Sequence, residues 1–127
     1  MKLQTSAFLD KGRELLGQAD TMMDVGLNEA AGRTAYLAGL HAAQALIFES
    51  TGKIIKRHRG VQSELQRLTK SEPSFDRELQ AFLGRAYHLK DIADYGTGAG
   101  AKVSAERALE AIQMARRFVE CVATFIR

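Results

Sequence analysis

Three histidines and a group of cations carry most of the chemistry that this 127-residue chain could perform. His58 lies in the segment GKIIKRHRG at 52–60, a predicted glycine-bounded loop that is rich in cations and contains no acidic residue. Metal-independent RNA cleavage needs a proton acceptor for the 2′-hydroxyl and a cation near the scissile phosphate. A histidine between two arginines supplies both residue types, so His58 is a candidate catalytic residue. A solvated basic turn fixed by this histidine is the alternative, and it is the favoured one.

The same segment is a better candidate for binding than for catalysis. Its four cations, Lys53, Lys56, Arg57 and Arg59, could contact phosphates without reading a base sequence. The segment holds no aromatic residue, so the base stacking usual in single-strand recognition is not indicated there.

Lys90 and Asp94 are four residues apart, a spacing that places them on one face of a helix and allows an ion pair. One interpretation is a cationic phosphate site in which Asp94 holds Lys90 and Tyr95 lies beside them. The other, which is favoured, is a structural ion pair that locks the end of this helix.

The two other histidines have weaker patterns around them. His41 shares a helix face with Thr34 and Gln44 in an apolar stretch, so it is either a general base or phosphate ligand or, more in keeping with its surroundings, a buried neutral histidine. His88 is a further catalytic candidate. With Arg85 and Asp91 it is expected to form an exposed polar row, which is either a solvated face or the lining of a dimer groove.

Composition excludes several other classes of protein. The single cysteine, Cys121, cannot form an internal disulfide or a zinc site, and this indicates a reducing cytoplasm. No signal peptide and no membrane span of about 20 apolar residues is expected. The glycines of 96–102 do not follow a strand and predict a flexible connection, not a phosphate-binding loop. We expect no metal and no cofactor.

These residues must be positioned by helices, because the apolar periodicity is helical throughout and no strand pattern appears. Helices are predicted over 3–25, 28–51, 61–70 and 74–94, with a last helix after Ser104. Asn28 and Ser104 are predicted N-caps, and Pro73 is predicted to mark a helix start. Residues 34–48 are apolar nearly all round, which predicts a buried central helix. The fold class is therefore all-α: one domain over 1–127, an antiparallel up-and-down bundle of four long helices and one short helix.

Several segments taken in order resemble one known family. They are AYLAGLHAAQALIFESTGK at 35–53, which includes His41, then the run His58 to Val61, then Lys90 with Asp94 and Tyr95, then Ser104 to Glu106, and finally Ala115 to Val119. Together they are similar to the small stand-alone HEPN domains of prokaryotes, over nearly the whole chain.

The resemblance implies a five-helix bundle that forms a homodimer. It also implies a separately encoded nucleotidyltransferase as partner, in a module of the toxin–antitoxin type. Other members of the family are metal-independent ribonucleases, in which an Arg precedes a His by four to six residues at the dimer interface. That spacing is absent here, since seven residues separate Arg33 from His41 and two separate Arg85 from His88.

We therefore expect a non-catalytic HEPN module that binds RNA or nucleotide phosphates and works with a nucleotidyltransferase. The alternative is a metal-independent ribonuclease that uses His58, Lys90 or His88 at a dimer interface. The sequence leaves open which helices would form that interface.

Overall fold

The computed structural model describes residues 1–126, and helices account for most of them. The five α-helices in this range are α1 (Leu3–Asp24), α2 (Asn28–Thr51), α3 (His58–Thr69), α4 (Arg77–Tyr95) and α5 (Ala105–Ile126). A short 3-10 helix, η1 (Ala99–Ala101), lies between α4 and α5. The predicted all-α bundle of four long helices and one short helix is confirmed.

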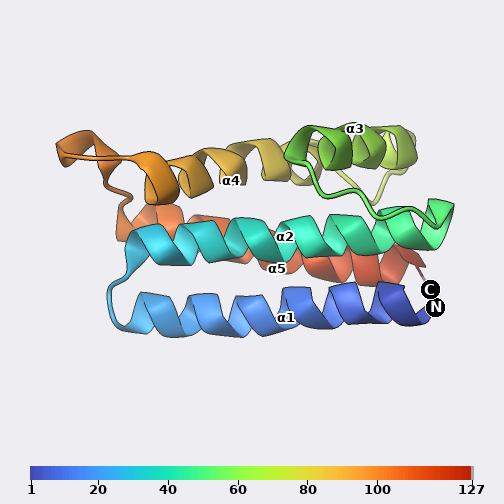
Figure 1. Cartoon of the computed structure of the whole chain (residues 1–127), viewed down its shortest axis with the longest axis horizontal. Helices are drawn as coiled ribbons and strands as arrows, with labels where there is room; N and C mark the ends of the chain where they lie inside the picture. The colour runs from blue at the N-terminus through green and yellow to red at the C-terminus, as the bar shows by residue number, and fades with distance from the viewer. Residues whose placement is uncertain (127) are drawn as a thin grey trace.

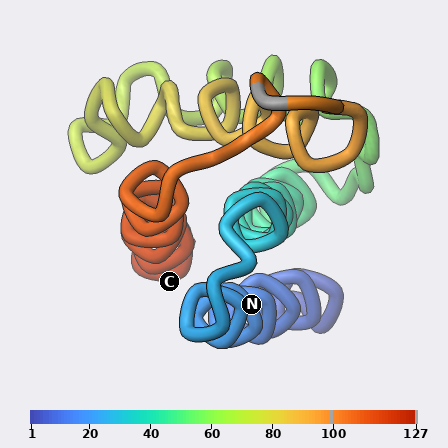
Figure 2. Tube along the Cα trace, turned by 90° about the vertical axis from the view of Figure 1, so that its left-hand side faces the viewer, coloured from blue at the N-terminus to red at the C-terminus, as the bar shows by residue number. Residues whose placement is uncertain are grey.

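The helices are arranged in layers around α2. Figure 1 shows α1 on one side of α2 and α5, and α3 with α4 on the other side. Figure 2 views α1, α2 and α5 nearly end-on, with α3 and α4 spread across them. The long helices alternate in direction along the chain, so α1 begins and α5 ends at the same end of the bundle (Figure 1).

The central helix α2 is buried because its side chains are small where its neighbours come close. Gly39 faces the ring of Phe82 on α4, and a Cβ atom at Gly39 would clash with that ring. Gly32 faces Leu89, which lies about two turns after Phe82 on α4. A Cβ atom at Gly32 would lie 3.3 Å from the Leu89 side chain. These two glycines therefore set how closely α2 and α4 approach each other.

Helix α3 begins at His58, so the prediction of a loop through residue 60 and a helix from 61 was wrong. Arg57 is extended and precedes the helix, while His58, Arg59 and Gly60 form its first turn. Gly60 does not interrupt the helix, because its missing side chain makes room for Ile55: a Cβ atom there would lie 2.8 Å from the Ile55 side chain.

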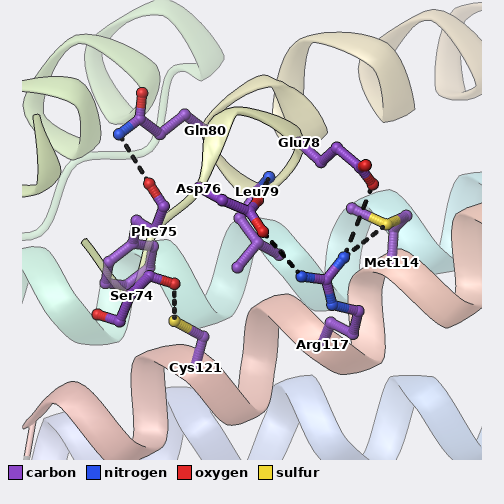
Figure 3. Close-up of polar contacts among 9 residues, drawn as sticks. All are labelled: Ser74, Phe75, Asp76, Glu78, Leu79, Gln80, Met114, Arg117 and Cys121. Atoms are coloured by element: carbon purple, nitrogen blue, oxygen red, sulfur yellow. Dashed lines mark hydrogen bonds and ion pairs between the residues drawn. The ribbon is translucent and has the colours of Figure 1, made fainter. Parts of the chain in front are cut away.

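Helix α4 begins at Arg77, three residues later than predicted. Asp76 is its N-cap and accepts a hydrogen bond from the Leu79 amide at 3.0 Å, so the cap and not Pro73 fixes the start of the helix. Figure 3 shows this end of α4, where the Arg117 guanidinium of α5 also donates to Asp76 at 3.0 Å.

The two predicted caps have different outcomes. Ser104 accepts a hydrogen bond from the Arg107 amide at 3.1 Å, as predicted. Asn28 is the first residue of α2 and makes no capping hydrogen bond, so that prediction was wrong.

None of the helices within residues 1–126 is both long enough and apolar enough to cross a membrane.

The packing of α2 against α4 predicts opposite effects for two glycine-to-alanine substitutions. Gly39→Ala is expected to lower the free energy of unfolding by about 1–3 kcal/mol, because the added methyl group meets Phe82. Gly17→Ala in α1 meets no atom within 4 Å and is exposed, so it is expected to raise that free energy by about 0.5–1 kcal/mol. Urea denaturation of both variants measures this difference, and equal values would contradict the close approach of α2 and α4.

Candidate functional site

The charged and titratable side chains that could bind a ligand or react meet where the second half of α4 lies against α2 and the start of α3. Asp94 lies at the centre of one group and accepts from two cations. Its Oδ1 is 2.7 Å from Nε of Arg33 on α2, and its Oδ2 is 3.1 Å from Nζ of Lys90. The ion pair predicted between Lys90 and Asp94 is therefore present, and Arg33 joins it.

The charges of this group do not cancel. One carboxylate lies between two cations, which leaves a surplus of one positive charge. The side chains of Arg33 and Lys90 are 42% and 21% exposed, so both remain accessible to solvent. Desolvation would raise the pKa of Asp94, but hydrogen bonds from Lys90 and Arg33 outweigh it and hold that pKa below its ordinary value. The hydrogen bond to Asp94 correspondingly raises the pKa of Lys90.

His58 forms a second group with two tyrosines. Its Nδ1 is 2.9 Å from the hydroxyl of Tyr36 on α2, and its ring stacks on Tyr87 of α4 with 3.9 Å between the ring centroids and 8° between the planes. Burial raises the pKa of the Tyr36 hydroxyl, with the nearby Tyr87 and Asp91 adding to the shift. Tyr36 therefore keeps its proton at neutral pH and is available as a hydrogen-bond donor to His58.

Desolvation is also the main reason why the pKa of His58 lies below its ordinary value. The cations Arg59 and Lys90 lower it further, while Gln62 and Asp91 oppose the shift. His58 is thus a neutral, stacked side chain at neutral pH, one ring nitrogen of which is already in a hydrogen bond.

The two groups join into one row along α4. Nζ of Lys90 lies 5.6 Å from the centroid of the Tyr87 ring and 5.2 Å from that of Tyr95. The order along the row is His58, Tyr87, Lys90 and Tyr95. Tyr95 lies beside Lys90, as one interpretation of the sequence expected, whereas the position of Tyr87 between His58 and Lys90 was not predicted.

Four further cations, named the loop cations, lie within five residues of His58 in the chain. Arg59 is in the first turn of α3, and the other three precede the helix. Lys53, Lys56, Arg57 and Arg59 are exposed, and among the residues that the structure describes none of these side chains forms an ion pair. The first turn of α3 contains no acidic residue and has no side-chain cap. The N-terminus of α3, which is the positive end of the helix dipole, therefore adds to the positive potential of segment 52–60.

His41 lies away from this row and is held in place by other contacts. Its Nδ1 is 2.8 Å from the amide oxygen of Gln44, and the Gln44 amide donates to the carbonyl of Ile55 at 2.9 Å. The imidazole also stacks on Phe8 of α1. This chain of contacts fixes the segment after α2 against the body of the bundle.

His88 also lies apart, on the opposite side of α4. With Arg85 it lines a groove of about 410 Å³ between α4 and α5, whose opposite wall includes Arg107 and Glu110. Asp91 was expected in the same exposed row, and this was wrong. Asp91 is half-buried, and its negative charge raises the pKa values of Tyr36 and His58.

Cys121 lies at neither site. Its thiol donates to the carbonyl of Ser74 at 3.3 Å, as Figure 3 shows. Burial raises the pKa of this thiol above its ordinary value, which makes the nucleophilic thiolate scarcer at neutral pH.

Three residues of this candidate site, Arg33, Tyr36 and Tyr87, were missed from the sequence. Arg33 was considered only as half of a nuclease signature, and Tyr36 only as part of a family motif. A signal was present for Tyr36, because a hydroxyl within an apolar helix needs a hydrogen-bond partner when it is buried. No local pattern points from Arg33 to Asp94, since 61 residues separate them.

In a comparison with known protein families, residues 5–125 match the HEPN domain. No curated protein matches the chain.

The lowered pKa of His58 predicts that stability depends on pH. The unfolded chain takes up a proton at His58 near pH 6.5, before the folded protein does, so the free energy of unfolding should fall as pH drops below about 6.5. The loss is expected to be under about 1 kcal/mol, because His58 remains partly solvated. It is measured as the difference in unfolding free energy between pH 7.5 and pH 5.

His58→Gln should reduce this pH dependence, since glutamine does not titrate. His88→Gln, at an exposed histidine on the far side of α4, is the matched control. A pH dependence that His58→Gln leaves intact would show that another group causes it.

Proposed function

The chain belongs to the HEPN domain family, and from that premise we propose that it is a non-catalytic binding module for the phosphates of RNA or nucleotides. The binding surface in this proposal combines Arg33 and Lys90 with the loop cations Lys53, Lys56, Arg57 and Arg59.

The observation that carries the proposal is the unequal charge around Asp94. A purely structural ion pair needs one cation, whereas Asp94 has two, and both are partly exposed. A phosphate near Arg33 and Lys90 would meet a net positive charge held in a fixed place. Arginine adds a planar set of donors suited to phosphate oxygens, and lysine adds a compact charge.

The loop cations extend the positive surface beyond this pair. Contacts of this kind bind the backbone of a nucleic acid without selecting a base sequence, and they make affinity sensitive to salt. The overall charge of +3 is modest, so binding would depend on this local concentration of cations.

Two observations argue for binding without catalysis. The Arg–His spacing that the ribonuclease members of the family carry is absent. His58 is fixed between Tyr36 and Tyr87, and Lys90 and Asp94 already form an ion pair. The ribonuclease alternative would require His58, Lys90 or His88 to act on a scissile bond, and His88 lies on the other side of α4 from the first two.

We also propose a homodimer and a separately encoded nucleotidyltransferase as partner, in a toxin–antitoxin module. This part of the proposal rests on family resemblance and not on a feature of the surface.

Removing Lys90 is expected to weaken the binding of RNA. Lys90→Ala should lower the affinity for a fluorescein-labelled 12-nucleotide RNA about 3- to 10-fold at 100 mM salt, and the slope of log affinity against log salt should fall by about 0.7. Arg33→Ala should have a similar effect. Fluorescence anisotropy across a salt series measures both quantities.

Lys11→Ala is the matched control, because Lys11 is a paired surface lysine on α1. The proposal fails if Lys11→Ala and Lys90→Ala change the affinity equally, or if the wild-type protein binds no RNA. The same RNA is then incubated with each protein in EDTA. Cleavage by the wild type that is lost in His58→Ala or Lys90→Ala would favour the ribonuclease alternative.

The proposed partner predicts that two proteins purify together. Co-expression with a nucleotidyltransferase encoded beside this chain should yield one complex on size-exclusion chromatography. The chain alone should show twice its mass of 14.0 kDa by light scattering. Separate elution of the two proteins would contradict the partner, and a mass of one chain would contradict the dimer.

A further inference from the structure

Tyr95 is a large aromatic side chain on the surface and the last residue of α4. It is 75% exposed, whereas the two other tyrosines of the chain are buried or half-buried. A single exposed aromatic residue is common on protein surfaces. What distinguishes Tyr95 is its position beside the cations of the proposed site.

The ring is held in place by the charged group next to it. Nζ of Lys90 lies over the ring at 5.2 Å from its centroid, the arrangement of a cation–π contact. Lys90 is itself fixed by its ion pair with Asp94 at 3.1 Å and by the ring of Tyr87 at 5.6 Å. One face of Tyr95 is thus covered by an ammonium group, while most of the side chain is open to solvent.

This arrangement matches the two chemical parts of a nucleotide. Every nucleobase has a π-face that can stack on an aromatic ring, and its phosphate is attracted to a cation nearby. Inside a duplex each base is covered on both faces by its neighbours, so only an unpaired base or one at a duplex end could lie on Tyr95.

We propose that Tyr95 stacks an unpaired base of single-stranded RNA while Lys90 and Arg33 contact its phosphates, so that Tyr95 makes this surface select single strands over duplex. The inference rests on the proposed function, because it assumes that these cations contact phosphates. It assigns the selection of the ligand to Tyr95, a residue outside the basic segment 52–60.

The test compares three forms of the protein: wild type, Tyr95→Phe and Tyr95→Leu. Phenylalanine keeps the ring and leucine keeps only an apolar side chain of intermediate size. The probes are a 12-nucleotide oligouridine that carries one 2-aminopurine, a 12-base-pair RNA duplex, and uridine monophosphate. Anisotropy or competition gives the affinities, and quenching of 2-aminopurine fluorescence reports stacking.

The wild type should bind the single strand more tightly than the duplex and should quench 2-aminopurine. Base–aromatic stacking is worth a fivefold to hundredfold change in affinity, so Tyr95→Leu should lower the single-strand to duplex affinity ratio by about tenfold and abolish the quenching. Tyr95→Phe should stay within about twofold of the wild type.

The other outcomes separate this inference from the proposed function. If Tyr95→Leu keeps the ratio and the quenching, Tyr95 has no stacking role, although phosphate binding by Lys90 would stand. If uridine monophosphate binds as tightly as the 12-nucleotide strand, the ligand is a free nucleotide, and the proposal of single-stranded RNA is contradicted. If the wild type binds neither RNA, the proposed function and this inference both fail.

Discussion

The close approach of α4 to the buried helix α2 is the constraint on which the rest of this molecule depends. It is possible because Gly39 has no side chain where the ring of Phe82 lies, and because Gly32 has none beside Leu89. Most of α2 is buried, so its few polar residues can reach only the elements packed against it. Arg33 and Tyr36 therefore reach the polar residues of α4 and α3, and the candidate site is built across a helix contact that apolar packing determines.

The candidate site combines rigid and accessible parts in a fixed order. At neutral pH His58 and Tyr36 are both uncharged and are hydrogen-bonded to each other. The rings of both residues pack against Tyr87. Lys90 comes next, and Tyr95 is the most exposed member of the row. The exposed part of the row thus packs on buried and half-buried groups, which lowers the side-chain entropy that the protein would lose on binding a ligand.

Sequence patterns predicted the fold class and the helix set, because amphipathic periodicity and capping are local properties. They also predicted the ion pair of Lys90 with Asp94, since four residues of helix place the two side chains together. Contacts between helices carried no such signal, so the addition of Arg33 to that pair and the bond from Tyr36 to His58 were missed. The predicted helix starts were wrong where tertiary contacts decided them. One example is the first turn of α3, in which Gly60 accommodates the Ile55 side chain.

The position of the chain ends has a practical consequence for handling this protein. α1 begins and α5 ends at one end of the bundle, and α4 ends with Tyr95 at the other (Figure 1). A biotin tag or a fluorescent fusion on either terminus would hold the domain with the Tyr95 end facing away from a sensor chip. Immobilisation through either terminus would therefore leave the Tyr95 end of the site open. Lys53, two residues past the end of α2, lies toward the anchor, because Lys2 donates to Glu49 near that end.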